Sequence, residues 1–275
     1  MRGGGPRATL PLDDNRRPDM DRDHVRINRD VWNADAENWV AAGERLWAAD
    51  APVWGNWGAP EAGLGLLRAD LSGKDAIELG CGTGYVSGWM ARRGARVTGI
   101  DVSPDQLATA RRLAREHGAD ITLIEGNAEA TGLPDAAFDF AISEYGAAIW
   151  CRPEVWLREA WRLLRPGGKL VFLGNHPLVL VCSPASGAPC DRTLHRPYRT
   201  LWGVDWSVVE IDPSGVCFNL PMSGWMRLFA DIGFVVEEYQ EIYIPEGETG
   251  TQSSIPAAWG QDFPAEQVWH LGKPG

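Results

Sequence analysis

Apolar residues from position 75 onward occur in short runs that alternate with amphipathic stretches, a pattern typical of strands alternating with helices. The runs that we predict to be β-strands are 75–80, 96–101, 121–125, 138–143 and 169–174. Helical periodicity predicts helices over 84–94 and 153–164, and a third that begins at Ser103, where Ser103 can cap and Gln106 can complete a capping box. Strands that alternate with helices predict an α/β fold with a parallel, doubly wound sheet.

The segments on either side of this region follow other patterns. Tryptophans and small apolar residues recur at three- and four-residue steps over 24–49, which predicts a helix. After residue 174 the alternation breaks, and we predict a hairpin of 206–211 with 216–220. The remaining predicted elements are a helix over 223–232, a strand over 234–244, a loop over 245–265 and a last strand near 268–271.

These patterns divide the chain into three parts. Residues 1–22 are rich in glycine, proline and charge, and we expect them to be disordered or loosely attached. Residues 23–60 are predicted to form a helical cap or lid. Residues 61–275 are predicted to form the main domain, with 175–226 as an insertion that covers a substrate.

A glycine-rich loop follows the first predicted strand, in the run Ala76-Ile77-Glu78-Leu79-Gly80-Cys81-Gly82-Thr83-Gly84. Glycines let a loop turn tightly and let its backbone lie against a ligand. A dinucleotide fingerprint would place its last glycine at position 85, where this chain has Tyr85. The pattern is instead E-x-G-x-G-x-G, and an acid, Asp101, follows seventeen residues after Gly84.

This pattern resembles motif I of the class I S-adenosylmethionine-dependent methyltransferases. The nearest subgroup is the small-molecule methyltransferases related to ubiquinone and menaquinone biosynthesis, and the resemblance is most specific over 76–175. It implies a Rossmann-like, doubly wound seven-stranded sheet, mostly parallel, with an antiparallel strand near the C-terminus. It also implies S-adenosylmethionine as the cofactor and S-adenosylhomocysteine as the product.

The resemblance assigns the cofactor to loops that follow successive strands. It implies that the glycine loop passes under the methionine and ribose, that Asp101 accepts hydrogen bonds from the ribose hydroxyls, and that Asn127 binds adenine. Family members often carry Asp at that place, so Glu129 can share or replace the role of Asn127, which is otherwise a turn residue. Carbonyls after the strand that ends at Ser143 are expected to hold the ammonium group. The implied cofactor-binding residues are Glu78, Gly80, Cys81, Gly82, Gly84, Asp101, Val102, Asn127, Ala128, Glu129 and Ser143.

Tryptophans near the N-terminus are further candidates, because aromatic faces attract a cation such as sulfonium. The run 31–39 also resembles this subgroup, in which an aromatic near Trp39 helps to cover the cofactor. Trp57 lies in the linker that follows and is a second candidate. An aromatic stripe at helical spacing is more often core packing, so both interpretations stay open.

Methyl transfer is an in-line displacement, and a general base is needed only when the acceptor must lose a proton. The candidate bases are His176, which follows the strand ending near 174, and Glu144 and Tyr145, which follow the strand ending at 143. Tryptophan, phenylalanine and methionine residues in the 175–226 insertion suit a small apolar or aromatic acceptor, or only pack the cap.

The charge and the cysteine content limit the binding partners, cellular location and metal content that we expect. The 26 basic and 37 acidic residues leave a net charge of −11, which disfavours nucleic acid and anionic membranes as partners. Five cysteines, without a C-x-x-C pair or a close histidine, predict reduced thiols, a cytoplasmic location and no metal. The oligomeric state stays open. Alternatives to a small-molecule methyltransferase are a non-methylating S-adenosylmethionine-binding protein, such as a cyclase or regulatory protein, and a protein or nucleic-acid methyltransferase.

Overall fold

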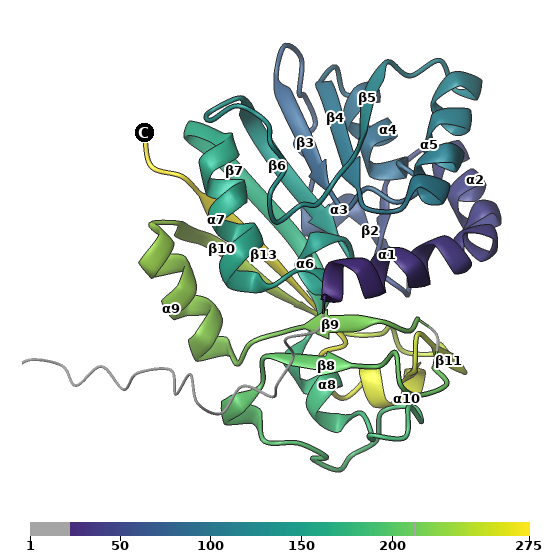
Figure 1. Ribbon diagram of the computed structural model, residues 1–275. Helices are drawn as coiled ribbons and strands as arrows, with labels where there is room; N and C mark the ends of the chain where they lie inside the picture. Colours follow the sequence, from purple (N-terminus) through teal and green to yellow (C-terminus); the bar gives the residue numbers. More distant parts are fainter. Residues whose placement is uncertain (1–22, 212) are drawn as a thin grey trace, which may run out of the picture.

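A seven-stranded sheet forms the centre of the computed structural model, which describes residues 23–211 and 213–275 (Figure 1). The strand order is β10-β13-β7-β6-β3-β4-β5. All neighbouring pairs from β7 to β5 are parallel, whereas β13 is antiparallel to both of its neighbours. The prediction of a mostly parallel, doubly wound sheet with one antiparallel strand is therefore confirmed. The strands are β3 Asp75–Leu79, β4 Arg96–Asp101, β5 Ile121–Glu125, β6 Phe138–Glu144, β7 Leu164–Asn175, β10 Val235–Ile242 and β13 Glu266–Gly272.

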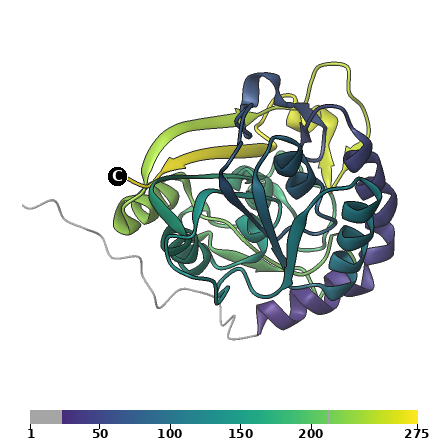
Figure 2. The same ribbon diagram turned by 90° about the horizontal axis from the view of Figure 1, so that it is seen from above.

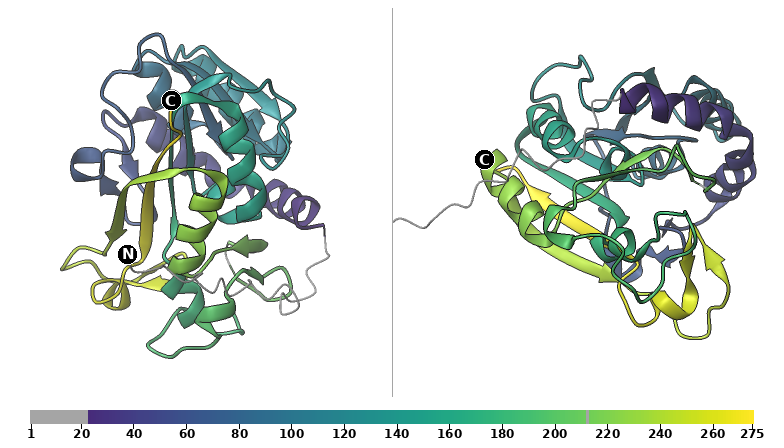
Figure 3. Two further views of the ribbon diagram at one scale, coloured as in Figure 1. Left: turned by 90° about the vertical axis from the view of Figure 1, so that its left-hand side faces the viewer. Right: turned by 60° about the horizontal axis from the view of Figure 1, so that its bottom comes forward.

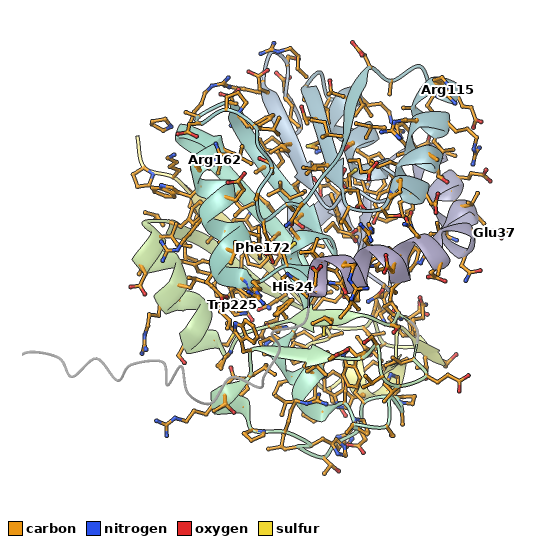
Figure 4. The ribbon with its side chains drawn as sticks, in the orientation of Figure 1. His24, Glu37, Arg115, Arg162, Phe172 and Trp225 are labelled. Carbon is orange, nitrogen blue, oxygen red and sulfur yellow. The ribbon has the colours of Figure 1, made fainter. Side chains whose placement is uncertain are left out.

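Helices cover both sides of the sheet (Figure 2). One core joins the strands to α7 (Pro153–Leu163) and α9 (Met222–Ile232). In this core Phe172 of β7 and Trp225 of α9 have ring centroids 5.5 Å apart (Figure 4). The second core joins the opposite strand residues to α4 (Tyr85–Arg92). This alternation follows from the side-chain period of a strand, in which successive residues face opposite sides.

Helix α5 (Pro104–Glu116) begins with the predicted N-terminal cap residue, Ser103. The Ser103 hydroxyl accepts a hydrogen bond from the Gln106 backbone N–H at 3.1 Å. The Ser103 backbone N–H, however, donates to Asp101 rather than to a Gln106 side chain, so this is a simple cap and not a capping box. Asp101 is thereby linked to the start of α5.

The predicted N-terminal helix is divided in three: α1 His24–Ala34, the short 3₁₀-helix η2 Ala36–Trp39, and α2 Val40–Ala48. The following segment holds short elements, which are β1 Val53–Trp54, β2 Ala59–Pro60 and α3 Glu61–Leu64. The expectation of disorder for 1–22 lies outside the described residues. None of the helices within 23–211 and 213–275 has the length and apolar character needed to cross a bilayer.

A cap lies beyond the edge at which the parallel strands end, and α1 runs between the sheet and this cap (Figures 1 and 3). We use "cap" for residues 177–221 and 245–265. Its first part contains α8 Pro177–Cys182, η3 Tyr198–Thr200, β8 Gly203–Asp205 and β9 Val216–Phe218. Its second part contains β11 Thr251–Gln252, β12 Ile255–Pro256 and α10 Ala257–Gly260. Between the sheet and the cap, α6 (Ala147–Trp150) follows β6.

The predicted hairpin has a different first strand. That strand is β8, not 206–211, because Asp205 accepts hydrogen bonds from Ser207 and turns the chain there. This difference does not alter the order of the sheet.

Candidate functional site

Two adjoining cavities lie where the parallel strands end. The first, which we call the strand-end cavity, has a volume of about 150 Å³ and is lined by the segments after β3, β4, β5 and β6 together with α1 and η2. The second, the cap cavity, has a volume of about 420 Å³ and lies among the cap, α2 and the loop of residues 53–58. The two cavities share a wall, formed by Trp32, Trp39, Thr83, Tyr85, Glu144, Tyr145 and Trp150.

The glycine loop after β3 forms the floor of the strand-end cavity. Gly80 has φ +79°, and a Cβ atom there would lie 2.6 Å from the Cα of Gly146. Only glycine therefore allows the loop after β3 to lie directly against the loop after β6. This close approach brings the ends of the two strands together at one site.

Asp101 ends β4 and points into the same cavity. Its Oδ2 accepts a hydrogen bond from the Gly82 backbone N–H at 2.7 Å, and its Oδ1 accepts one from Ser103 N–H at 2.8 Å. Burial raises the pKa of the Asp101 carboxyl, and these backbone donors oppose that effect. A carboxylate has about four acceptor positions, so both oxygens can still accept from a bound ligand.

Glu78 lines the strand-end cavity, but its carboxylate accepts hydrogen bonds from Ser87 of the protein itself. One carboxylate oxygen accepts from the Ser87 backbone N–H at 2.7 Å and from the Ser87 hydroxyl at 2.5 Å. Burial raises the pKa of Glu78 well above its ordinary value. The side chain thus connects β3 to the first turns of α4.

Of the two polar residues in the loop after β5, Asn127 reaches the cavity and Glu129 does not. Asn127 lines the strand-end cavity, and its Oδ1 accepts a hydrogen bond from Glu129 N–H at 2.9 Å. Glu129 lies outside that lining, because its carboxylate is 2.7 Å from Nε2 of His24 and accepts from Arg152 N–H at 2.6 Å. Figure 4 shows His24 at the beginning of α1, so Glu129 fastens this helix over the site.

Two tyrosine–glutamate pairs stand at or behind the shared wall. Tyr85 donates a hydrogen bond to Glu144, whose other oxygen accepts from Gly55 N–H at 3.0 Å. Tyr145 donates to Oε1 of Glu266 at 2.6 Å. Burial raises the pKa of Glu144, and it raises the pKa of Glu266 to about 7.

His176, a predicted base, lines neither cavity. Its Nδ1 accepts a hydrogen bond from Leu178 N–H at 3.2 Å and caps α8. Its Nε2 lies 3.4 Å from Glu241, and burial lowers the pKa of the imidazole to about 4. The other candidate bases, Glu144 and Tyr145, both lie in the shared wall.

Most of the residues predicted to bind the cofactor converge on the strand-end cavity. Those that line it are Trp39, Glu78, Gly80, Cys81, Gly82, Asp101, Val102, Asn127 and Ala128.

Gly84, Glu129, Ser143 and Trp57 do not line the strand-end cavity. Gly84 faces Ala110 of α5, and the Ser143 hydroxyl donates to the Leu79 carbonyl at 2.7 Å. Trp57 packs in a separate apolar cluster within the cap.

Sequence reasoning did not identify several residues at this site. Tyr85 stands where a dinucleotide fingerprint has glycine, and Glu266 belongs to the last strand of the chain, so no motif predicts a role for either of them. Residues 252–254, in the segment predicted as a plain loop, line the cap cavity. This strand also contains Gln267 and His270, so its pattern of polar residues does not distinguish Glu266.

Comparisons with known proteins agree with this geometry. Residues 77–172 match the family model of a methyltransferase domain. A fatty-acid O-methyltransferase of Mycolicibacterium smegmatis is 34% identical over 112 residues, which are 40% of this chain and 40% of that protein. A demethylmenaquinone methyltransferase of Thermus thermophilus is 37% identical over 113 residues, which are 40% of this chain and 51% of that protein.

A solved structure supports the same fold. The S-adenosylmethionine-dependent methyltransferase from Mesorhizobium loti has a TM-score of 0.59 at 24% identity, covering 76% of this chain and 94% of its own. Residues 77–172 thus resemble a methyltransferase domain, and the chain has the fold of this S-adenosylmethionine-dependent methyltransferase, in agreement with the glycine motif. The matches span only 40% and 51% of the two relatives, so the activity and acceptor of the whole protein belong to the proposal that follows.

Proposed function

We propose that this protein transfers a methyl group from S-adenosylmethionine to a small molecule by in-line displacement, with S-adenosylhomocysteine as the second product. The observation that carries the proposal is the shared wall between the two cavities. A transferase for two small molecules needs two adjoining sites, because orientation of the reacting groups supplies much of the rate increase.

The strand-end cavity fits the cofactor. The Asp101 carboxylate suits a ribose diol, since hydrogen bonds to a charged acceptor are strong. Val102 and Ala128 supply apolar surface for a base, beside the amide of Asn127. When bound, the cofactor supplies an activated methyl group on a sulfonium centre.

The cap cavity suits the acceptor. Its lining combines apolar side chains from Leu180, Trp206 and Ile211 with polar residues 252–254, a combination common in pockets for small organic molecules. The names of the relatives, a fatty-acid and a demethylmenaquinone methyltransferase, favour a small apolar or aromatic acceptor. Nucleic acid is disfavoured by the net charge of −11.

The proposal includes a lid formed by residues 23–60 and an insertion, residues 175–226, that covers the substrate. In its support, the Asn28 amide of α1 donates to the carbonyls of Trp150 and Val216 at 3.0 and 2.9 Å, so α1 is tied to both α6 and β9. Such a cover would exclude water from the reacting groups. A cytoplasmic location is also part of the proposal and rests on the unpaired cysteines.

Calorimetry tests the cofactor site. Asp101→Ala should weaken S-adenosylmethionine binding about 10- to 100-fold, because hydrogen bonds to a charged group contribute about 1.5–3 kcal/mol. Asp105→Ala is the matched control, since Asp105 is exposed and lines neither cavity. Equal binding by the two variants would contradict the ribose assignment.

Product analysis separates methyl transfer from the alternatives. Incubation with S-adenosylmethionine and candidate small molecules should yield S-adenosylhomocysteine and methylated product in equal amounts. Cofactor binding without S-adenosylhomocysteine would favour a cyclase or regulatory protein.

A further inference from the structure

Glu266 is a buried carboxylate that neither the family motifs nor the comparisons single out. It is fully buried, and its Oε2 has no hydrogen-bond partner among the described residues. Gly55, at φ +69°, lies so close that a Cβ atom there would collide with both carboxylate oxygens. The glycine allows the loop of residues 53–58 to close over an acid that is shielded from solvent.

The antiparallel strand explains why this acid reaches the site. Glu266 is the first residue of β13 and pairs in register with Asn175, near the end of β7. Because β13 is antiparallel to β7, its beginning lies at the edge where the parallel strands end. The carboxylate therefore lies behind the shared wall, although it is far from the glycine loop in sequence.

Tyr145 connects Glu266 to the two cavities. It lines both of them, and its backbone has φ +52°, a conformation that costs energy for a non-glycine residue. Its hydroxyl donates to Glu266 at 2.6 Å and accepts from the Asn56 side-chain amide at 2.9 Å. Asn175 Oδ1, at 3.0 Å, is a second acceptor that the hydroxyl can use once Glu266 is protonated.

The neighbouring pair, Tyr85 and Glu144, lacks these features. Both carboxylate oxygens of Glu144 already accept a hydrogen bond, one from Tyr85 and one from Gly55. In Glu266, by contrast, Oε1 accepts from both the Tyr145 hydroxyl and Asn56 N–H at 2.8 Å, and Oε2 accepts from neither. A proton can reach Oε1 along the Tyr145 hydrogen bond, and the Tyr145 hydroxyl has alternative partners, which suits this pair to receive a proton.

We propose that Tyr145 and Glu266 form a proton relay that accepts the proton of a phenol-type hydroxyl in the cap cavity as that oxygen is methylated. The acceptor O–H bond breaks, and its proton passes to the Tyr145 oxygen while the Tyr145 proton passes to Glu266. The acceptor oxygen gains the methyl group as the methyl–sulfur bond breaks, and the bonding electrons stay on sulfur. Tyr145 is the catalytic residue, and Glu266 acts through it. This inference rests on the proposed function.

The strength of the base selects the acceptor class. Burial raises the pKa of Glu266 to about 7. A base of that strength can assist removal of a proton from a phenol, whose pKa is about 10 as for tyrosine. A carboxylic acid is already ionised near neutral pH and needs no relay. The aromatic side chains Trp150 and Trp206 of the cap cavity also suit a phenolic ring.

Infrared titration of the full chain tests the relay without any acceptor. The carboxyl C=O band should disappear in a step near neutral pH, and Glu266→Gln should abolish that step. Tyr145→Phe should move it to higher pH, because the Tyr145 hydrogen bond favours the ionised carboxylate. Glu125→Gln is the control, since Glu125 is exposed, and it should leave the step in place. A step unchanged in Glu266→Gln would overturn the proposal.

Turnover with defined probes tests the acceptor class. S-adenosylhomocysteine is measured with phenol, hydroquinone and catechol, and with octanoate as the carboxylic acid. We expect turnover of at least one phenol, a fall of about 100-fold or more in Tyr145→Phe and Glu266→Gln, and loss of the rise in rate with pH in Glu266→Gln. Turnover of octanoate alone, of no phenol, or of phenols at an undiminished rate in both variants would overturn it. Calorimetry of S-adenosylmethionine binding distinguishes such a failure from failure of the proposed function.

Discussion

The strand-end cavity and the cap cavity differ in how the chain builds them. The first is formed largely by loops that follow successive strands, between residues 78 and 151, with α1 and η2 laid across them. The second is assembled from segments far apart in sequence, including 53–58, 175–183, 206–217 and 252–254. A cavity made from strand ends can be predicted from local motifs, whereas a cavity made from distant segments cannot.

The largest expected effect is at the glycine loop. Gly80→Ala places a Cβ 2.6 Å from the Gly146 Cα and strains a backbone at φ +79°. We expect S-adenosylmethionine affinity to fall at least about 100-fold, equivalent to roughly 3 kcal/mol. Calorimetry measures this, and circular dichroism confirms that the variant is folded.

Gly118→Ala is the matched control for that substitution. Gly118 also has a positive φ, of +62°, but a Cβ there meets nothing within 4 Å. It should lose stability of about 1–3 kcal/mol through strain and retain affinity. An equal loss of affinity in both variants would mean that strain alone, and not the contact with Gly146, governs the cofactor site.

A smaller effect is expected at the wall that the cavities share. Trp39 lines both cavities, whereas Trp57 lines neither. Trp39→Ala should weaken S-adenosylmethionine binding about 3- to 10-fold, because a cation over an aromatic face gains about 0.5–2 kcal/mol. Trp57→Ala should leave binding unchanged. The same affinity for both variants would remove Trp39 from the cofactor site.

The third expected effect concerns the stability of the fold behind the shared wall and not cofactor affinity. Glu266 keeps its proton up to about pH 7 in the folded protein, whereas the unfolded chain releases it near 4.5. The folded protein therefore loses stability as pH rises from 4.5 to about 7, while Glu266→Gln has no such titration. The free energy of unfolding of Glu266→Gln, compared with that of the unsubstituted protein, should therefore rise over this pH window by no more than about 3 kcal/mol. Above the window the difference should stay constant.

Urea unfolding at several pH values measures this difference. Glu125→Gln, at an exposed position, should show no pH-dependent difference from the unsubstituted protein. A constant difference between Glu266→Gln and the unsubstituted protein across the window would mean that Glu266 titrates normally.

The sequence predicted the sheet well because its evidence is local. Alternating apolar runs predicted the strands, and the resemblance of the glycine loop and Asp101 to a methyltransferase motif predicted the fold and most of the lining of one cavity. Polar side chains whose hydrogen bonds are made to other parts of the protein were harder to assign. Ser143 lies near the end of β6 and Glu129 lies in the loop after β5, but they bond to Leu79 and His24 and not into the cavity.

The remaining site residues depend on contacts across the whole chain. Glu266 meets Tyr145 only because β13 is inserted antiparallel beside β7. Gly55 and Asn56 reach the same place through a loop that no motif marks. Such long-range pairing has no signature in the periodicity of a single sequence.

A crystal structure of the protein with S-adenosylhomocysteine would show whether the strand-end cavity holds the donor and the cap cavity the acceptor. We expect adenine beside Asn127 and Ala128, the ribose hydroxyls on Asp101, and the sulfur atom facing the shared wall at Glu144 and Tyr145. A sulfur atom directed away from the cap cavity would contradict the claim that the two cavities serve donor and acceptor.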